Sequence, residues 1–263
     1  MDAYGPGDDA QPLHPMNESP SPSRLDVMQA LEDGWQAFRR APWAFVLFIL
    51  LVAALCGLFN GIARTGMTEA GEVRGAVGGI AVLVGGIGST VVSLWGMTGM
   101  VRGAWLALDG QRPAFAEFSR WDGRAAGRLF LRQLTLAVVL LLIIVLAVVV
   151  GLGLTRLNEA LLWVPAAVAL LLLAYLTVNQ TFLPYVALLE GPGPMATIQR
   201  GREMVDPAWG QVLLLLLLEA VLVMAGMLLC FVGLLVAAPV VACTSTAAYR
   251  QLFGREDRTG LLG

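Results

Sequence analysis

The sequence has no lysine, one histidine and three cysteines, and only 14% of its 263 residues are charged. Soluble domains usually carry about 25% charged residues, so this composition disfavours a soluble fold. All 17 basic residues are arginines, and the formal net charge is −2, which argues against nucleic acid as a partner. The cysteines Cys56, Cys230 and Cys243 lie in apolar stretches without a CxxC spacing, and we interpret them as small buried side chains, not as metal ligands.

Familiar catalytic motifs are missing too. The chain contains no HExxH, GxSxG, GxxxxGK[ST] or GxGxxG pattern. The single histidine, His14, lies in residues 1–23, where the abundance of Pro, Gly, Ser and Asp predicts a disordered N-terminal tail. A hydrolase needs a nucleophile with a positioned base, which this histidine cannot supply. We therefore expect a protein that is not an enzyme and that holds no cofactor or metal ion.

Long apolar runs are abundant, and 57% of the residues are hydrophobic. A membrane-spanning helix needs about 20 consecutive apolar residues. We predict an all-α fold, a polytopic transmembrane helical bundle that occupies residues 24–254 and is followed by a short C-terminal tail, residues 255–263. The predicted membrane domain has about six spans, at residues 43–63, 76–101, 133–155, 161–186, 209–229 and 233–250.

The last two spans are predicted from one run, residues 211–249, whose only charged residue is Glu219. As a single helix with about 1.5 Å per residue, this run would be roughly 58 Å long. The hydrocarbon core of a bilayer is only about 30 Å thick. We therefore expect the chain to fold back near Cys230–Gly233.

Three less apolar segments have amphipathic patterns and are expected to form interfacial helices that lie along the membrane surface. The first covers residues 24–40. The second lies within residues 104–131 and follows Pro113, and the third, residues 191–206, begins at Pro194, since proline favours the first turn of a helix. The first helix could also bind a partner protein, and the sequence leaves both interpretations open.

Arginine is distributed unevenly between the two predicted sides of the membrane. With six spans, 14 of the 17 arginines fall on the side that holds both termini. Because positively charged loops stay in the cytoplasm, we expect the N- and C-termini to be cytoplasmic. The exclusive use of arginine, whose codons are rich in G and C, indicates a bacterial genome, so we expect a multi-pass protein of the bacterial inner (plasma) membrane.

The ends of the second, fourth and sixth predicted spans have similar sequences. Each begins with an aromatic residue, and the first two continue with an acid-Gly-x-x-Pro motif. The aromatic residues are Trp105, Tyr185 and Tyr249, and the motifs are Asp109–Pro113 and Glu190–Pro194. Chance similarity of helix caps is one explanation. The other is a three-fold internal repeat of one interfacial helix and two spans, and such repeats occur in transporters and in scaffolds.

The second predicted span is rich in glycine, with GxxxG spacings at Gly75/Gly79 and Gly99/Gly103. Small residues let helix backbones approach closely in a bilayer. We expect these glycines to pack within the bundle, and dimerisation or a pore lining are the alternatives. The expected partners are therefore membrane lipids, together with a membrane-protein partner or a second copy of the chain that contacts this span.

Glu219 lies near the middle of the fifth predicted span, where a charge costs on the order of 2.5–3.5 kcal/mol. Asn179 and Gln180 in the fourth span complete the candidate intramembrane polar site. One interpretation is a polar seam that serves a proton, a cation or another ligand. The other is that these side chains only hydrogen-bond to neighbouring helices.

Three stretches resemble a family of bacterial six-span membrane proteins without an assigned function: ALEDGWQAFRRAPWAFVLFILL at 30–51, LALDGQRPAFAEF at 106–118 and LLCFVGLLVAAPVVACTSTAAYRQLFG at 228–254. That family is similar to the membrane domain of some bacterial glycerophosphodiester phosphodiesterases. The resemblance covers residues 25–254 and implies a fold but no reaction, because the catalytic barrel is absent. We expect an accessory or scaffold protein in the bilayer, active in complex assembly or lipid handling. The alternative is a small-solute or ion transporter or channel that uses a polar seam around Glu219.

Overall fold

The computed structural model describes residues 25–156, 158, 161, 163–229 and 232–262. The predicted disordered tail, residues 1–23, lies outside the described residues, as does Cys230. Within the described part of the chain, helices make up the fold and no β-strand forms. The elements are α1 (Val27–Arg40), α2 (Pro42–Thr65), α3 (Gly75–Leu108), α4 (Phe115–Ser119), α5 (Gly123–Leu154), α6 (Trp163–Asn179), α7 (Leu183–Tyr185), the π-helix η2 (Val186–Glu190), α8 (Pro194–Val205), the 3-10 helix η3 (Asp206–Ala208), α9 (Trp209–Leu228) and α10 (Leu234–Phe253).

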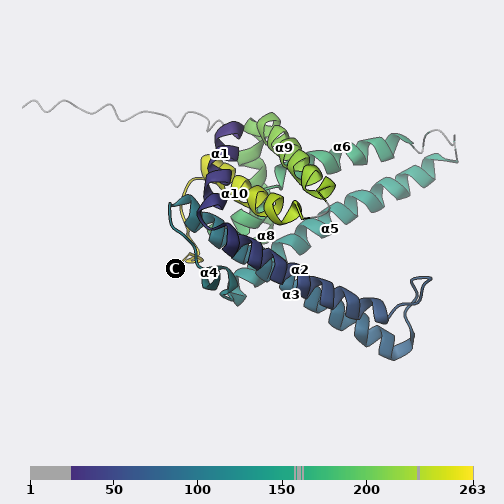
Figure 1. The fold of residues 1–263 in the computed structure, drawn as a ribbon. Coiled ribbons are helices and arrows are strands. Elements are labelled where there is room, and N and C mark those ends of the chain that lie inside the picture. Colours follow the sequence, from purple (N-terminus) through teal and green to yellow (C-terminus); the bar gives the residue numbers. More distant parts are fainter. Residues whose placement is uncertain (1–24, 157, 159–160, 162, 230–231, 263) are drawn as a thin grey trace, which may run out of the picture.

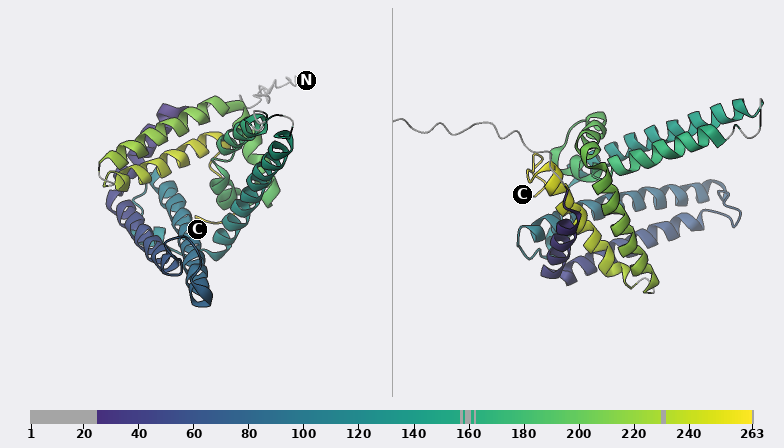
Figure 2. Two further views of the ribbon diagram at one scale, coloured as in Figure 1. Left: turned by 90° about the vertical axis from the view of Figure 1, so that its right-hand side faces the viewer. Right: turned by 90° about the horizontal axis from the view of Figure 1, so that it is seen from above.

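Three helical hairpins diverge from a common base (Figure 1). The hairpins pair α2 with α3, α5 with α6, and α9 with α10, and Figure 2 shows from two further sides that they point in different directions. A shorter helix, α1, α4 or α8, precedes each hairpin. We call the hairpins the arms. The base consists of α1, α4, α7, η2, α8 and the adjoining ends of the long helices.

Several helices are suited to a bilayer. Helices α2, α3, α5 and the continuous run Pro194–Leu228 are long and apolar enough to cross a membrane, and the bent pair Trp163–Asn179 and Leu183–Glu190 would add a fifth crossing. Helix α10 is not among them, because its second half carries the polar stretch Thr244–Thr246 and Arg250. These helices fit a multi-pass membrane protein.

Helix ends form where the acid-Gly motifs predict them. Gly110 and Gly191 have φ angles of 83° and 69° and follow the ends of α3 and η2. A residue with a side chain would be strained in this left-handed conformation. Pro194 occupies the first turn of α8, as predicted. Asp122 caps α5 by accepting a hydrogen bond of 2.9 Å from the backbone N–H of Ala125.

Three helices differ from the predicted bounds, and the first of them, α3, continues to Leu108 instead of ending near residue 101. Helix α5 begins at Gly123 instead of near residue 133, because the cap at Asp122 starts the helix before the uniformly apolar stretch. Helix α6 ends at Asn179, and the continuation Leu183–Glu190 is bent by 47° relative to it. Pro184 lies in the first turn of α7 and has no backbone N–H to donate to the carbonyl of Gln180, four residues earlier, so the helical hydrogen bonds of α6 do not continue through it. The segment predicted as the fourth span is therefore divided.

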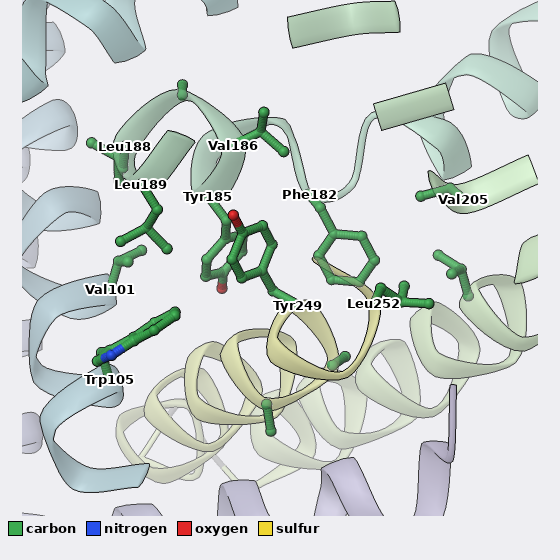
Figure 3. Close-up of a cluster of buried hydrophobic side chains, with 14 of the residues drawn as sticks. Val101, Trp105, Phe182, Tyr185, Val186, Leu188, Leu189, Val205, Tyr249 and Leu252 are labelled. Carbon is green, nitrogen blue, oxygen red and sulfur yellow. The ribbon is translucent and has the colours of Figure 1, made fainter. Parts of the chain in front are cut away.

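The largest hydrophobic core lies in the base. There Tyr249 of α10 contacts Trp105 of α3 and Tyr185 of α7, with ring centroids 6.3 and 5.4 Å apart. Figure 3 shows these three rings with Phe182 beside them. The aromatic residues that align at the ends of the second, fourth and sixth predicted spans thus meet in one cluster.

Candidate functional site

Glu219 points from α9 to the neighbouring helix of the same arm. Its carboxylate Oε1 accepts a hydrogen bond of 2.6 Å from the hydroxyl of Ser245 on α10, and only 7% of the residue is exposed. Ser245 belongs to the polar stretch Thr244–Thr246 that the sequence places in the last predicted span. The contact therefore joins the two helices of the α9/α10 arm.

Asn179 and Gln180 lie elsewhere, at the end of α6 in the base. The Asn179 side-chain amide donates to Asp206 at 2.8 Å, and the Tyr175 hydroxyl donates to the same carboxylate oxygen at 2.6 Å. The Gln180 side-chain amide donates to the carbonyl of Ile198 at 3.0 Å. These bonds tie α6 to α8 and η3. Among the described residues, no hydrogen bond links either amide to Glu219.

The hydroxyl groups of the second predicted span have their own local partners. Ser89 accepts a hydrogen bond from Asn60 of α2 at 3.3 Å, and Ser93 lies 3.7 Å from the sulfur of Cys56. Thr90 donates to the carbonyl of Gly86 in its own helix. The structure therefore distributes the polar residues singled out from sequence over separate local contacts in different arms and in the base.

Buried arginines in the base are functional candidates that sequence reasoning missed. Arg102 of α3 is fully buried, and its guanidinium donates to the carbonyls of Glu117, Arg120 and Leu261 at 3.0–3.1 Å. Two of these acceptors lie at the end of α4, and the third belongs to the segment that follows α10. Because one guanidinium has five N–H donors in a fixed planar fork, Arg102 can join three segments at once.

Four further arginines repeat this use of helix-end carbonyls. Arg40 and Arg250 donate to Ala107 and Trp105 near the end of α3, at 2.6 and 2.8 Å. Arg128 donates to the carbonyl of Leu188 within η2 at 3.4 Å. Arg132 donates to the carbonyls of the two residues that follow η2, Gly191, at 3.1 Å, and Pro192. The carbonyls at the end of a helix have no partner within that helix. The signal in the sequence was the arginines clustered at predicted helix ends, which we used only for orientation.

The glycines of α3 mostly pack inside the chain. A Cβ atom at Gly85 or Gly96 would meet α2, at 2.5 Å from the carbonyl oxygen of Phe59 and 2.8 Å from Val52. Gly99 and Gly103 are covered by Phe118 of α4. By contrast, Gly75 and Gly86 have open space around them and a Cβ atom at Gly79 would meet only Val73, at 3.8 Å, so the predicted packing of the Gly75/Gly79 pair is wrong. Close packing within the bundle therefore explains most of this glycine-rich span.

An apolar groove of about 580 Å³ lies between α3 and the start of α5. Its only hydroxyl, that of Thr90, is already bonded to the carbonyl of Gly86. The groove thus offers mostly apolar contact area, and the indole N–H of Trp121 is its other polar side-chain group among the described residues. It is lined by Val82, Leu83, Gly86, Ile87, Thr90, Val91, Leu94, Trp121, Gly123, Ala126, Gly127 and Phe130.

Metal binding finds no support in the described part of the chain, where no group of three or more His, Cys, Asp or Glu side chains is placed to hold an ion. Comparison with protein-family models, with curated proteins and with solved structures finds no match to this chain.

Proposed function

We propose that the chain is an accessory or scaffold protein of the bacterial inner membrane that works within the bilayer, in lipid handling or in the assembly of a larger complex. In this proposal it has six spans, with both termini in the cytoplasm, where most of the arginines then lie. Its immediate partners are membrane lipids. The resemblance to the membrane domain of bacterial glycerophosphodiester phosphodiesterases agrees with an auxiliary role but supplies no reaction.

The three arms support the six-span arrangement and the three-fold repeat. Each arm has two antiparallel helices and a shorter helix before it. The acids of the two acid-Gly motifs also have matching partners, since Asp109 pairs with Arg250 at 2.9 Å and Glu190 pairs with Arg200 at 3.1 Å. Helix α10 would be the sixth span, because Thr244 lies against Gly34 of α1, Ser245 bonds to α9 and Arg250 bonds to Trp105 of α3 instead of facing lipid.

The groove between α3 and α5 is the observation that carries the functional proposal. It is open, apolar and lined by small residues on both helices, and this surface suits an acyl chain or the apolar face of another membrane helix. A path for ions would need polar groups that face a cavity. Among the described residues, the side chains of the groove supply only the Thr90 hydroxyl, which is bonded to Gly86, and the indole N–H of Trp121.

The proposal is tested by extracting the protein with its surrounding lipid into native nanodiscs and identifying by mass spectrometry what remains bound. A retained lipid species, lost when Gly127→Leu fills the groove, would support lipid handling. A stoichiometric membrane-protein partner lost with the same variant would support complex assembly. Gly57→Leu is the matched control, because Gly57 on α2 also has open space around it and lies outside the groove. Recovery of the chain with no specific lipid or protein would contradict the proposal.

Transport or channel activity is the alternative, and the burial of Glu219 in a candidate span is the observation that favours it. We expect Glu219→Gln to leave folding intact, because the amide oxygen can still accept the bond from Ser245. Proton and potassium fluxes in proteoliposomes are the measurement, and we expect none with the parent chain. A flux that the parent chain supports and Glu219→Gln abolishes would replace the accessory role with transport.

A further inference from the structure

A second cavity, of about 240 Å³, opens in the base between α1 and α10. In contrast to the groove between α3 and α5, most of its lining is polar. Its volume is several times the ~30 Å³ that a water molecule occupies in the liquid, so a phosphate group fits. It is lined by Gln29, Asp33, Gln36, Arg40, Leu108, Ala247, Arg250, Gln251 and Arg255.

Three arginines reach this cavity from three different segments. Arg40 ends α1, Arg250 lies in the last turn of α10, and Arg255 follows Gly254, whose φ of 94° turns the chain at the end of that helix. With Asp33 in the lining and Asp109 bonded to Arg250, the three arginines leave a formal charge of +1 around the cavity. Like charges gathered from separate segments repel one another unless an anion lies between them.

Arg250 is a built part of the wall and not a surface side chain. Its side chain is 6% exposed, is fixed by Asp109 at 2.9 Å, and stacks over the Trp105 ring with the guanidinium carbon 3.9 Å from the ring centroid. Its Nε atom, however, is buried and has no hydrogen-bond partner within the described residues. The buried side-chain nitrogen of Gln251, also in the wall, has none either.

Both unsatisfied atoms in this wall are donors. A buried donor without a partner is unfavourable, so these two residues of the wall favour a ligand that brings acceptors. Arg255 adds a guanidinium that makes no hydrogen bond or ion pair in the part of the chain that the structure describes, and Arg40 uses only one nitrogen, toward Ala107. Guanidinium groups that converge from several sides match the oxygens of a phosphate.

We propose that this cavity is a binding site for a phosphate group, recognised by Arg40, Arg250 and Arg255. The phosphate can belong to a lipid headgroup or to a soluble molecule, because both present the same negatively charged oxygen acceptors to the arginines. The site is independent of the proposed function, because it uses neither the groove nor Glu219.

The first measurement is the unfolding temperature of the full chain in detergent micelles, titrated with inorganic phosphate against chloride at equal ionic strength. The second compares nanodiscs of phosphatidylcholine with nanodiscs of equal parts phosphatidylcholine and phosphatidylglycerol. Arg255→Gln is the test variant, since this exposed side chain has no bond that folding would lose. Arg112→Gln is the matched control, because it removes the same charge from an exposed arginine outside the cavity.

We expect phosphate to stabilise the parent chain and Arg112→Gln alike, and Arg255→Gln to weaken the apparent affinity roughly tenfold, as the loss of one charge-assisted hydrogen bond implies. Arg40→Gln, as a second lining variant, should weaken it in the same way. Stabilisation by inorganic phosphate identifies a soluble source. Stabilisation only by phosphatidylglycerol, lost in Arg255→Gln, identifies a lipid headgroup. If neither probe separates Arg255→Gln from Arg112→Gln, the site does not exist.

Discussion

The base and the arms are held together by different physical means. In the base, large side chains such as Arg102, Phe182 and Leu215 are fully buried, and guanidinium groups bond to carbonyls of other segments. In the arms, only 6% of the residues in the most apolar stretch of α5 are buried within the protein, and 11% of those in the most apolar stretch of α2. The base therefore resembles the interior of a soluble domain, whereas the outer faces of the arms depend on lipid. Substitutions of the same kind should therefore cost much more stability in the base than in the arms.

The largest effect is expected from Arg102→Met, which keeps much of the side-chain volume but removes every donor. The carbonyls of Glu117, Arg120 and Leu261 would each lose a partner, and we expect a loss of stability on the order of 3–5 kcal/mol. The measurement is thermal unfolding of the chain in nanodiscs. Arg124→Met, at an exposed arginine, is the control and should change little. Equal unfolding temperatures for the two variants would show that the base does not depend on these bonds.

A leucine pair sharpens the comparison. Leu215→Ala leaves a cavity in the core of the base, where the side chain is fully buried, and should cost about 2–5 kcal/mol. Leu142→Ala in α5, where 62% of the residue is exposed, should cost little, because lipid tails are as apolar as leucine. Chemical unfolding in nanodiscs measures both. A large loss at Leu142 would place that face of α5 in a protein contact.

A glycine pair gives the smallest expected effect. At Gly34 a Cβ atom would lie 2.6 Å from the backbone nitrogen of Thr244, so Gly34→Ala must push α1 away from α10 and should cost about 1–3 kcal/mol. Gly57→Ala in α2 meets nothing within 4 Å and should be neutral or slightly stabilising. Unfolding temperatures of the two variants decide this. If Gly34→Ala is as stable as Gly57→Ala, the contact between α1 and α10 is looser than described.

Local signals in the sequence predicted the helix ends well. The cap at Gly191 and the start of α8 at Pro194 follow from the conformational preferences of those residues. The division of the fourth predicted span was missed, although Pro184 near its end is a signal for a break in a helix. Composition alone predicted an all-helical chain with helices suited to a membrane.

The candidate site was predictable only in part, because contacts between distant segments leave no local pattern. Glu219 was recognised as a buried polar residue, but its partner Ser245 lies 26 residues later, on the other helix of the hairpin. Asn179 was grouped with Glu219 on chemistry alone, whereas the fold places it beside Asp206. Asp206 ends the third predicted interfacial segment and was not singled out from the sequence.

The bonds of Arg102 also have an order in time. Its acceptors at Glu117 and Arg120 follow it by 15 and 18 residues, but the acceptor at Leu261 follows by 159. At roughly 5–20 residues synthesised per second, Leu261 is added to the chain on the order of ten seconds or more after Arg102. Arms can thus enter the bilayer as they are made, while the base closes only after the segment beyond α10 has left the ribosome.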